Sequence, residues 1–392
     1  MIQIINPKQP QLQVADILRN HIADYQKAYP LWSEHRKIVS DLLNCRTPHL
    51  GGRIERCDNC GAMRATFHSC RNRHCPRCQH MPREQWLEKR KDEILPVSYF
   101  HVVFTLPHEL NTIILNNKKV MFNILFAAAS KTLLKFGENE LNGTPGFLAI
   151  LHTWDQKLQA HFHLHCIVAA GVVSKDCKRW IACKNDYLFN QDALSLVFRG
   201  KFMQRMSDAI KNKNLKFTGN TYKKLKNMLF NKKWVVSVRD PVKRPEDVLE
   251  YLARYTHRVA IANSRIKALK DGMVTFSVKN RKKKRPELIT ISAVEFIRRF
   301  LLHSLPKRFV KIRHYGFLAN RNRTKNIKKI RLIMGLSEPA AKDILPLEEM
   351  MQKYTGIDIS ICPCCNEGKM QLYDEIPRAR ARAPNRLLRV GA

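Results

Sequence analysis

Acidic residues are scarce in this sequence. Asp and Glu number 33 against 70 Lys and Arg in 392 residues, which gives a formal net charge of +37. A solvated helix face explains a few extra lysines, but it does not explain an excess over the whole chain. Chains this basic act on polyanions, and the commonest polyanion is nucleic acid. Binding to a membrane surface is the lesser alternative, and an acidic protein partner comes third.

Long apolar runs and targeting patterns are also missing. No run approaches the roughly 20 residues of a membrane span, and the first residues, MIQIINPKQPQLQV, lack the basic and apolar regions of a secretory signal. There is no Walker A pattern and no Ser-His-Asp signature. Apolar residues still make up 44% of the chain, which is enough to build buried cores. We expect a protein of a reducing, cytoplasmic compartment that does not use a membrane.

Segments with strand and helix patterns alternate along the chain without an internal repeat. Apolar runs predict strands at 98–106, 146–154, 161–173 and 234–238, and helical spacing covers 11–44, 82–94, 109–136, 191–212 and 221–230. The strands 146–154 and 161–173 are close enough to form an antiparallel hairpin. A second hairpin would have the basic segment 279–286 at its tip. This mixture predicts an α+β fold with an antiparallel sheet and flanking helices.

The cysteines are clustered at metal-binding spacings. Two C-x-x-C pairs, Cys57 with Cys60 and Cys75 with Cys78, are separated by 14 residues, and they predict one structural zinc site in a small N-terminal module. Cys70, His68 and His74 are spare donors, so one of them could replace a ligand or help to hold a second ion, and Cys45 lies close upstream. At the other end of the chain, Cys362, Cys364 and Cys365 supply a C-x-x-C alone, which is half of a metal site.

Basic residues surround the predicted zinc module and the second hairpin. We expect both groups to contact DNA phosphates, which gives affinity and salt dependence rather than sequence choice. The residues are Arg71, Arg73 and Arg77 beside the cysteines, and Arg281, Lys282, Lys283, Lys284 and Arg285 at the hairpin tip.

Three histidines recur at alternate positions in HFHLHCIVAAG. Alternate residues of a strand share one face, so His161, His163 and His165 would stand in one row. Such a row suits a divalent metal with coordination positions left open to water or phosphate oxygens. His163 and His165 are the expected ligands, and His152 on the preceding strand is the favoured third. His161 is the main rival for that position, and Gln156 and Gln159 are weaker rivals.

A nucleophile is also needed for transfer of a polynucleotide strand. Tyr251 and Tyr255 in EYLARYTHR are four residues apart, so a helix would place both on one face. A phenol is a weak nucleophile until nearby positive charge helps it to ionise. The alternative is an ordinary aromatic stripe in a core.

Several of these motifs occur together and in order. They include CRTPHLGG, CDNCG, SCRNRHCPRCQ, YFHVVFTLPHEL, LHTWDQKLQAHFHLHCIV, YLARYTHRVAIANSRI and EFIRRFLLHSLPKRFVKIRHYGFLANR. Over most of its length the chain resembles the rolling-circle transposases of the insertion-sequence-91 family. These have a histidine-hydrophobe-histidine (HUH) metal site and two tyrosines. One departure is Phe162, where related sequences often have proline.

The resemblance implies a metal-dependent transferase of DNA strands. His163 and His165 would hold Mg²⁺ or Mn²⁺, Tyr251 and Tyr255 would be the nucleophiles, and the N-terminal cysteines would hold structural zinc. The enzyme would cleave and rejoin single-stranded transposon ends through a 5′-phosphotyrosine. The alternatives are a replication initiator or relaxase of the same chemistry, and a zinc-containing DNA-binding protein without catalysis.

The same resemblance suggests three consecutive domains. Residues 1–95 would form a helical and zinc-binding DNA-binding module, 96–320 the HUH and two-tyrosine catalytic domain, and 321–392 a basic helical region with a C-x-x-C. The expected partners are single-stranded transposon ends and target DNA, with further copies of the chain in a homo-oligomer as an additional option. The expected setting is a bacterial cytoplasm, with nucleoid association when the protein is bound to DNA.

Overall fold

The computed structural model describes most of the chain. The described residues are 12–91, 93–184, 186–215, 219–244, 247–248, 259–279, 285–337 and 345–379. Contacts divide the chain into two compact units, each assembled from separate stretches. One contains Met1–Pro82, Ile261–Arg298 and Asp343–Ala392, and the other contains Arg83–Ala260 and Arg299–Lys342.

The second unit is organised by a six-stranded antiparallel sheet. Its strand order is β11-β4-β5-β3-β7, and β6 pairs with β5. The strands are β3 (Tyr99–Thr105), β4 (Gly143–Trp154), β5 (Ala160–Ser174), β6 (Trp180–Ala182), β7 (Val235–Val242) and β11 (Ile312–Gly316). The long central strands are rich in β-branched and aromatic residues, which suit a sheet buried on both faces.

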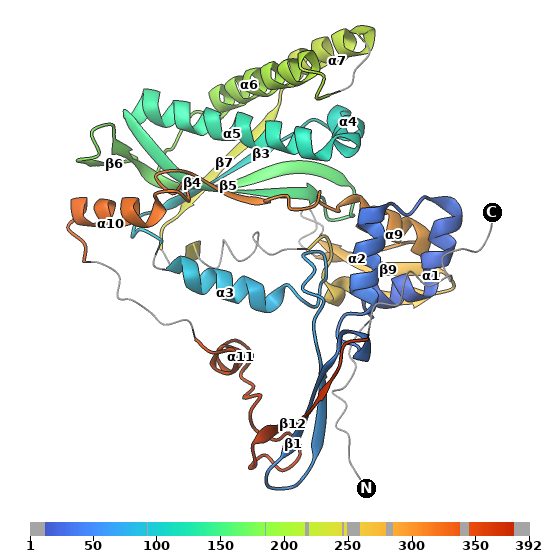
Figure 1. Cartoon of the computed structure of the whole chain (residues 1–392). Helices are drawn as coiled ribbons and strands as arrows, with labels where there is room; N and C mark the ends of the chain where they lie inside the picture. The colour runs from blue at the N-terminus through green and yellow to red at the C-terminus, as the bar shows by residue number, and fades with distance from the viewer. Residues whose placement is uncertain are drawn as a thin grey trace. The chain divides into compact units, whose positions relative to one another are not determined.

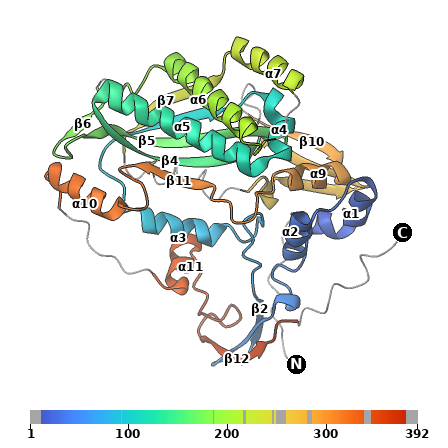
Figure 2. The same cartoon turned by 45° about the horizontal axis from the view of Figure 1, so that its top comes forward.

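Helices cover one face of this sheet. The long helices α5 (Lys118–Leu141) and α6 (Gln191–Lys211) lie across it, as both views show (Figures 1 and 2). Phe104 and Leu164 from the sheet pack there with Phe126 and Phe202 from the helices. α4 (Asn111–Asn116), α7 (Gly219–Asn231) and the 3-10 turn His108–Leu110 complete this side. Because period-2 alternation sends these large side chains to one face, the intervening residues must face the other way.

The opposite face carries a second, smaller apolar layer. Leu148 and Ile167 pack there with Leu87 of α3 (His80–Lys91) and with Ile327 and Ile330 of α10 (Arg323–Ile333). The layer ends along β4 and β5 where histidines replace the aliphatic residues. We call the face opposite α5 and α6 the open face, and its polar end is the candidate site.

One helix has the length and composition of a membrane span. Among the residues that the structure describes, α5 alone passes this test, although the sequence shows no uninterrupted apolar run of that length. Its most apolar window is 67% buried within the protein. The apolar surface of α5 is therefore accounted for by the core that it forms with the sheet.

The first unit combines helices with two small antiparallel sheets. One sheet has the order β12-β1-β2 and the other the order β10-β9-β8. The helices are α1 (Val14–Ala28), α2 (Ser33–Leu43), α9 (Ala293–Leu302) and α11 (Leu347–Thr355), with 3-10 turns at Pro48–Leu50 and Asn263–Arg265. The strands are β1 (Gly52–Cys57), β2 (Met63–Phe67), β8 (Ile266–Lys270), β9 (Met273–Lys279), β10 (Pro286–Ser292) and β12 (Met370–Ile376).

The predicted α+β class is confirmed, and so is the antiparallel pairing of β4 with β5. The second hairpin also forms, since Lys279 pairs with Pro286, but its tip at 280–284 lies outside the described residues. The compact units differ from the three consecutive domains expected from the sequence. The reason is that β12, near the end of the chain, pairs with β1, so both ends belong to one unit.

His314, in the apolar layer of the open face, makes the stability of the fold depend on pH. Its ring shares a small pocket with Tyr99, Leu148 and Ile167, and neither ring nitrogen has a hydrogen-bond partner among the residues described. Burial lowers the pKa of His314 to about 3, and the charges of Arg323 and Arg90 act in the same direction. An unfolded imidazole titrates near 6.5, so this neutral histidine costs stability as the pH falls from about 6.5 toward 3.

We expect His314→Leu to remove this acid-sensitive contribution. Between pH 7.5 and pH 5 the wild type should lose up to about 2 kcal/mol that the variant retains. Thermal unfolding followed by circular dichroism at the two pH values measures the difference. His108→Leu, at an exposed histidine, should behave as the wild type. Equal pH dependence in all three proteins would contradict the assignment.

Candidate functional site

The hairpin of β4 and β5 brings three histidines together on the open face of the sheet. In its register His152 pairs with His163, and Ile150 pairs with His165. Side chains of His163 and His165 are on the same face because they are two residues apart. Nitrogen atoms of His152, His163 and His165 all lie within 4.8 Å of one another, and all three side chains are buried. The structure therefore assembles the three histidines that the sequence ranked first.

Hydrogen bonds orient two of these rings. Nδ1 of His163 lies 2.9 Å from the carbonyl oxygen of His161, which can only accept, so this Nδ1 carries the proton and Nε2 keeps its lone pair. Nδ1 of His165 lies 2.7 Å from Nε2 of His101. When that Nδ1–H donates to His101, Nε2 of His165 is the unprotonated ring nitrogen. The two Nε2 atoms are 3.0 Å apart.

This arrangement fits a divalent cation. Neighbouring ligands about 2.1 Å from an octahedral ion are about 3.0 Å apart. Two lone pairs facing each other at that distance repel unless a cation lies between them. Metal-ligating histidines usually donate their other ring N–H to a fixed acceptor, as these rings can. Three imidazoles could therefore hold a divalent metal and leave positions in its coordination shell for oxygen ligands.

Burial keeps His165 and the neighbouring His101 neutral, and neutral imidazole is the form that binds metals. It lowers the pKa of His165 well below the ordinary value, and positive charge on His152 and His163 acts in the same direction. Burial also lowers the pKa of His101 to about 3, with a further contribution from Arg239. His101 and His165 are therefore held in the neutral form at neutral pH.

Two residues of this region were missed from the sequence. His101 on β3 supports His165, and Arg239 on β7 pairs with His101 across the strands. Arg239 is exposed and close enough to influence both His101 and His165. The alternation within SYFHVVFTL was a usable signal for His101, because it places that side chain between the aromatic residues of a buried strand.

The rival ligands lie at the edge of the cluster. His161 is exposed, and its ring centroid is 4.8 Å from that of His163, but it is not one of the three converging histidines. Gln156 and Gln159 belong to the connecting turn. There the side chain of Asp155 accepts hydrogen bonds from the amides of Lys157 and Gln159. The geometry favours His152 over these alternatives as the third ligand.

Tyr251 and Tyr255 lie outside the described residues. The nearest described residue before them is Val248, which is 1% exposed. Val248 packs in the apolar layer that includes Ile150 and Ile167. Val248, three residues before Tyr251, thus lies on the face of the sheet that carries the histidines.

The cysteines form two clusters instead of the single predicted site. Cys75 and Cys78 lie with Cys45 and Cys70, and all four sulfur atoms are within 4.8 Å of one another. Cys45 Sγ is 3.4 Å from Cys78 Sγ and 3.6 Å from Cys75 Sγ. Four thiolates around zinc are about 3.8 Å apart, so this cluster has the size of a closed tetrahedral site.

Cys57 and Cys60 lie elsewhere, next to Cys362 and Cys365. The two C-x-x-C pairs that the sequence grouped together are therefore divided between clusters. The hairpin β1–β2 is the physical reason, since it leads the chain away after Cys57 and returns before Cys70. His74 is in neither cluster; its amide donates to the side chain of Asn72.

The basic residues proposed for DNA binding differ in their surroundings. Arg71 is exposed, whereas Arg73 is half-buried and its burial lowers the guanidinium pKa. Arg77 donates to the carbonyl oxygen of Cys45, so it supports the cysteine cluster. At the second hairpin, Arg285 is exposed, and Arg281, Lys282, Lys283 and Lys284 lie outside the described residues.

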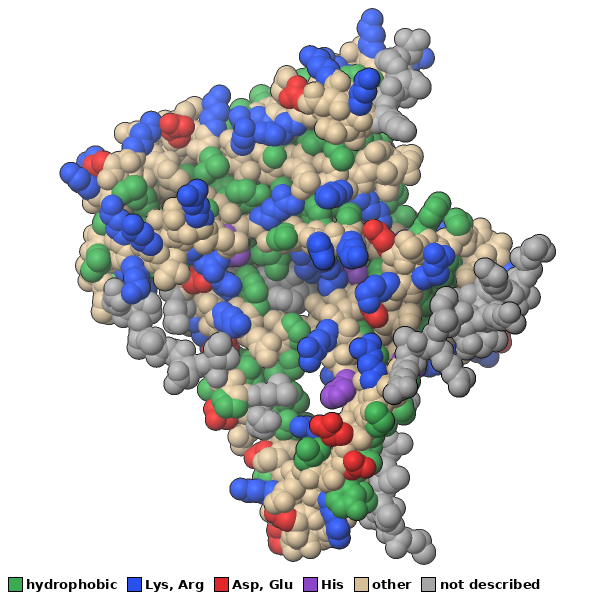
Figure 3. Space-filling view, viewed as in Figure 1, with side chains coloured by type: hydrophobic (Ala, Val, Ile, Leu, Met, Phe, Trp, Pro, Cys, Tyr) green, Lys and Arg blue, Asp and Glu red, His purple; other side chains and the backbone are tan. Residues whose placement is uncertain are grey.

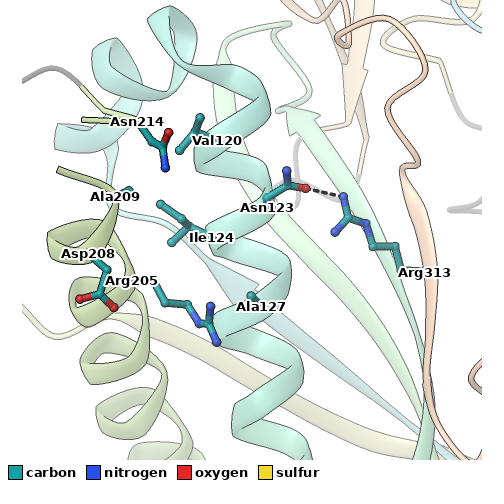
Figure 4. Close-up of a pocket in the computed structure, with 9 residues that line it drawn as sticks. All are labelled: Val120, Asn123, Ile124, Ala127, Arg205, Asp208, Ala209, Asn214 and Arg313. Atoms are coloured by element: carbon teal, nitrogen blue, oxygen red, sulfur yellow. Dashed lines mark hydrogen bonds between the residues drawn. The ribbon is translucent and has the colours of Figure 1, made fainter. Parts of the chain in front are cut away.

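A cavity of about 460 Å³ lies on the helical side of the second unit. It is lined by residues of α5 and α6 together with Arg313, which donates to the side chain of Asn123 (Figure 4). Arg205 and Asp208 add one charge of each sign. Its lining contains none of the converging histidines, so cavity size does not identify the candidate site.

Comparison with known proteins agrees with these features. A family model described as "Putative transposase" matches residues 146–326, and a "Transposase zinc-binding domain" model matches residues 17–106. "Putative transposase y4qJ" of Sinorhizobium fredii (strain NBRC 101917 / NGR234) is 41% identical over 382 residues, which cover 93% of this chain and 96% of that protein. This chain belongs to the insertion-sequence-91-like transposase family.

A more distant relative extends the comparison. "Transposase for insertion sequence element IS801" of Pseudomonas savastanoi pv. phaseolicola is 23% identical over 345 residues, covering 84% of this transposase and 81% of the relative. Transposases cleave DNA or transfer its strands, so DNA is the polyanion that the excess of Lys and Arg fits. The region matched by the "Putative transposase" model contains the three histidines. The region matched by the zinc-binding domain model contains the cluster of Cys45, Cys70, Cys75 and Cys78.

The division of ligands in the N-terminal module can be tested with one pair of variants. We expect Cys70→Ser to lower the zinc content of this transposase by one ion per chain, because Cys70 is one of four converging sulfurs. His74→Ala should leave the zinc content unchanged. Elemental analysis of the purified proteins measures both. Loss of zinc in the His74 variant but not in the Cys70 variant would contradict the geometry.

Proposed function

We propose that this transposase cleaves and rejoins single-stranded transposon ends through a covalent 5′-phosphotyrosine. The observation that carries the proposal is the convergence of His152, His163 and His165 on the open face of the sheet. A bound Mg²⁺ or Mn²⁺ would polarise a phosphate oxygen and offset the negative charge that develops when phosphorus is attacked. The histidines would hold the ion, and the remaining positions would admit the scissile phosphate.

The nucleophile in this proposal is the hydroxyl oxygen of Tyr251 or Tyr255. Attack forms a bond from that oxygen to phosphorus and breaks the bond from phosphorus to the 3′ oxygen of the preceding nucleotide. The phenol loses its proton, and the departing 3′ oxygen gains one. A later attack by a 3′-OH reverses the step and releases the tyrosine, so no ATP is needed. Two tyrosines permit two linked transfers.

The buried position of Val248 supports the choice of these tyrosines. This residue packs on the histidine-bearing face three positions before Tyr251. On a helix, Val248, Tyr251 and Tyr255 would follow one another on the same side. The proposal therefore requires that residues 248–255 form one helix.

Positive charge near the histidines supports phosphate binding. Arg239 is exposed on β7, and its charge reaches His101 and His165. Lys and Arg also outnumber acidic residues over the face of the molecule in Figure 3. Such contacts release counterions from DNA, so binding should weaken steeply with salt. We propose a cytoplasmic protein that associates with the nucleoid through DNA.

Two alternatives make different use of the same residues. A replication initiator or relaxase would share the chemistry, but membership of the transposase family favours transposon ends as the substrate. A zinc-containing DNA-binding protein without catalysis would explain the cysteines and the charge. It would not explain three buried imidazoles that converge on one point.

The decisive experiment seeks a covalent complex between the protein and DNA. Wild-type protein with a single-stranded end oligonucleotide and Mn²⁺ should give an adduct that survives denaturation. We expect the His163→Ala, His165→Ala variant to lose cleavage by at least about 100-fold, because metal stabilisation is worth several kcal/mol. It should keep most of its affinity for single-stranded DNA, because that affinity comes from the basic surface.

Replacement of both tyrosines by Phe provides the matched control. This variant should form no adduct yet bind Mn²⁺ as tightly as the wild type. Cleavage at the wild-type rate by the double-histidine variant would show that the histidines are structural. An adduct formed by the double-phenylalanine variant would exclude the tyrosines.

The role of His101 can be separated from that of the ligands. We expect His101→Leu to weaken Mn²⁺ binding by about 10- to 100-fold, because it removes the partner that orients His165. His101→Gln retains an acceptor for the His165 Nδ1–H and should lose less. Isothermal titration calorimetry measures both affinities. Equal, wild-type affinity in the two variants would show that the hydrogen bond does not orient the ligand.

A further inference from the structure

Segments from the two ends of the chain pair within the first unit. β12 runs antiparallel to β1 from Gly52 opposite Ile376 to Cys57 opposite Met370. Figure 1 shows the red C-terminal strand lying along the blue N-terminal strand. β1 is thus the central strand of a three-stranded sheet whose outer strands come from positions more than 300 residues apart.

A cluster of four cysteines lies at the end of this sheet. Each of the two segments contributes one C-x-x-C pair, and the four sulfur atoms lie within 4.8 Å of one another. Cys57 Sγ is 3.7 Å from Cys365 Sγ, and Cys60 Sγ is 3.7 Å from Cys362 Sγ. These distances match the roughly 3.8 Å between thiolates on a tetrahedral zinc ion, whereas a disulfide requires about 2.05 Å.

Backbone amides point at the sulfur atoms of both pairs. The amide of Cys60 donates to Cys57 Sγ over 3.4 Å. In the C-terminal pair, the amides of Cys364 and Gly368 donate to Cys362 Sγ and Cys365 Sγ over 3.4 and 3.3 Å. Such donors stabilise thiolates, which are the form that binds zinc. The two turns therefore have similar local chemistry although they are distant in sequence.

The close approach of the two turns is built into the surrounding residues. A side chain at Gly368 would place its Cβ 2.5 Å from Cys57 Sγ, so only glycine fits there without movement. Asp58 also joins the segments, since its amide donates to the Lys369 carbonyl and its carboxylate accepts from the Lys369 amide. Arg64 donates to the carbonyl oxygen of Ile359 just before the C-terminal pair.

We propose that Cys57, Cys60, Cys362 and Cys365 bind a second structural zinc ion, which fastens the C-terminal segment to the N-terminal zinc module. Four protein thiolates leave no open coordination position, so the ion would stabilise the fold and take no part in catalysis. The matched zinc-binding domain ends at residue 106, so half of the ligands come from outside it. This inference is independent of the proposed DNA cleavage.

The zinc content of four proteins tests the assignment. Wild-type protein, purified under reducing conditions without chelator, should contain two zinc ions per chain by native mass spectrometry. The Cys362→Ser, Cys365→Ser variant should contain one. Cys364→Ser, an exposed cysteine of the same motif that lies outside the cluster, should retain two. Gly368→Ala should bind the second ion more weakly than wild type.

Native alkylation of the wild type gives a test that does not depend on how the variants fold. Cys60, Cys177 and Cys364 are all exposed. If zinc occupies the cluster, iodoacetamide should label Cys177 and Cys364 rapidly but label Cys60 only after zinc is removed with a chelator. Peptide mapping by mass spectrometry reads out each cysteine.

Several results would overturn the proposal. One zinc ion in the wild type, or two in the Cys362→Ser, Cys365→Ser variant, would exclude the second site. Labelling of Cys60 as fast as Cys364 in the native protein would do the same. Protection of Cys60 that is lost with a reductant but not with a chelator would assign disulfides in place of zinc.

Discussion

The register between β4 and β5 is the constraint on which the candidate site depends. It sets His152 opposite His163 and leaves His165 on the same face, so one pairing brings three imidazoles together. A slip of one residue would turn the side chains of one strand to the other face. The register is maintained by the helical side of the sheet, where Phe104 and Leu164 are buried against α5 and α6. The chemistry of one face thus depends on packing at the other.

The chain contains two kinds of side-chain cluster that could bind a metal. Both cysteine clusters bring four thiols together, which suits a closed tetrahedral ion that holds loops in place. The histidine cluster offers three imidazoles and therefore leaves coordination positions for substrate oxygens. Sulfur ligands favour zinc. A site whose ion also binds phosphate oxygens can take a harder cation. These donor types suit the structural role that we propose for the cysteines and the catalytic role that we propose for the histidines.

Local sequence patterns were enough to predict the central strands of the fold. Apolar runs predicted β3 and the β4–β5 hairpin, and the row of histidines followed from the two-residue period of a strand. The sequence predicted fewer of the features that depend on distant pairing. The sequence predicted no strand between residues 45 and 80, because β1 and β2 are short and gain their third strand from β12. Spacing alone paired Cys57 and Cys60 with Cys75 and Cys78, because spacing does not show which segments the folded chain brings together.

The position of a divalent ion tests the central claim most directly. Crystals of the protein grown with Mn²⁺ and a single-stranded end oligonucleotide would show the ion by its anomalous scattering. The account predicts one peak on the open face of the sheet, about 2.1–2.2 Å from Nε2 of His163 and of His165, with His152 as the third protein ligand and a phosphate oxygen also bound. An ion bound elsewhere, with the three imidazoles hydrogen-bonded only to one another, would contradict it.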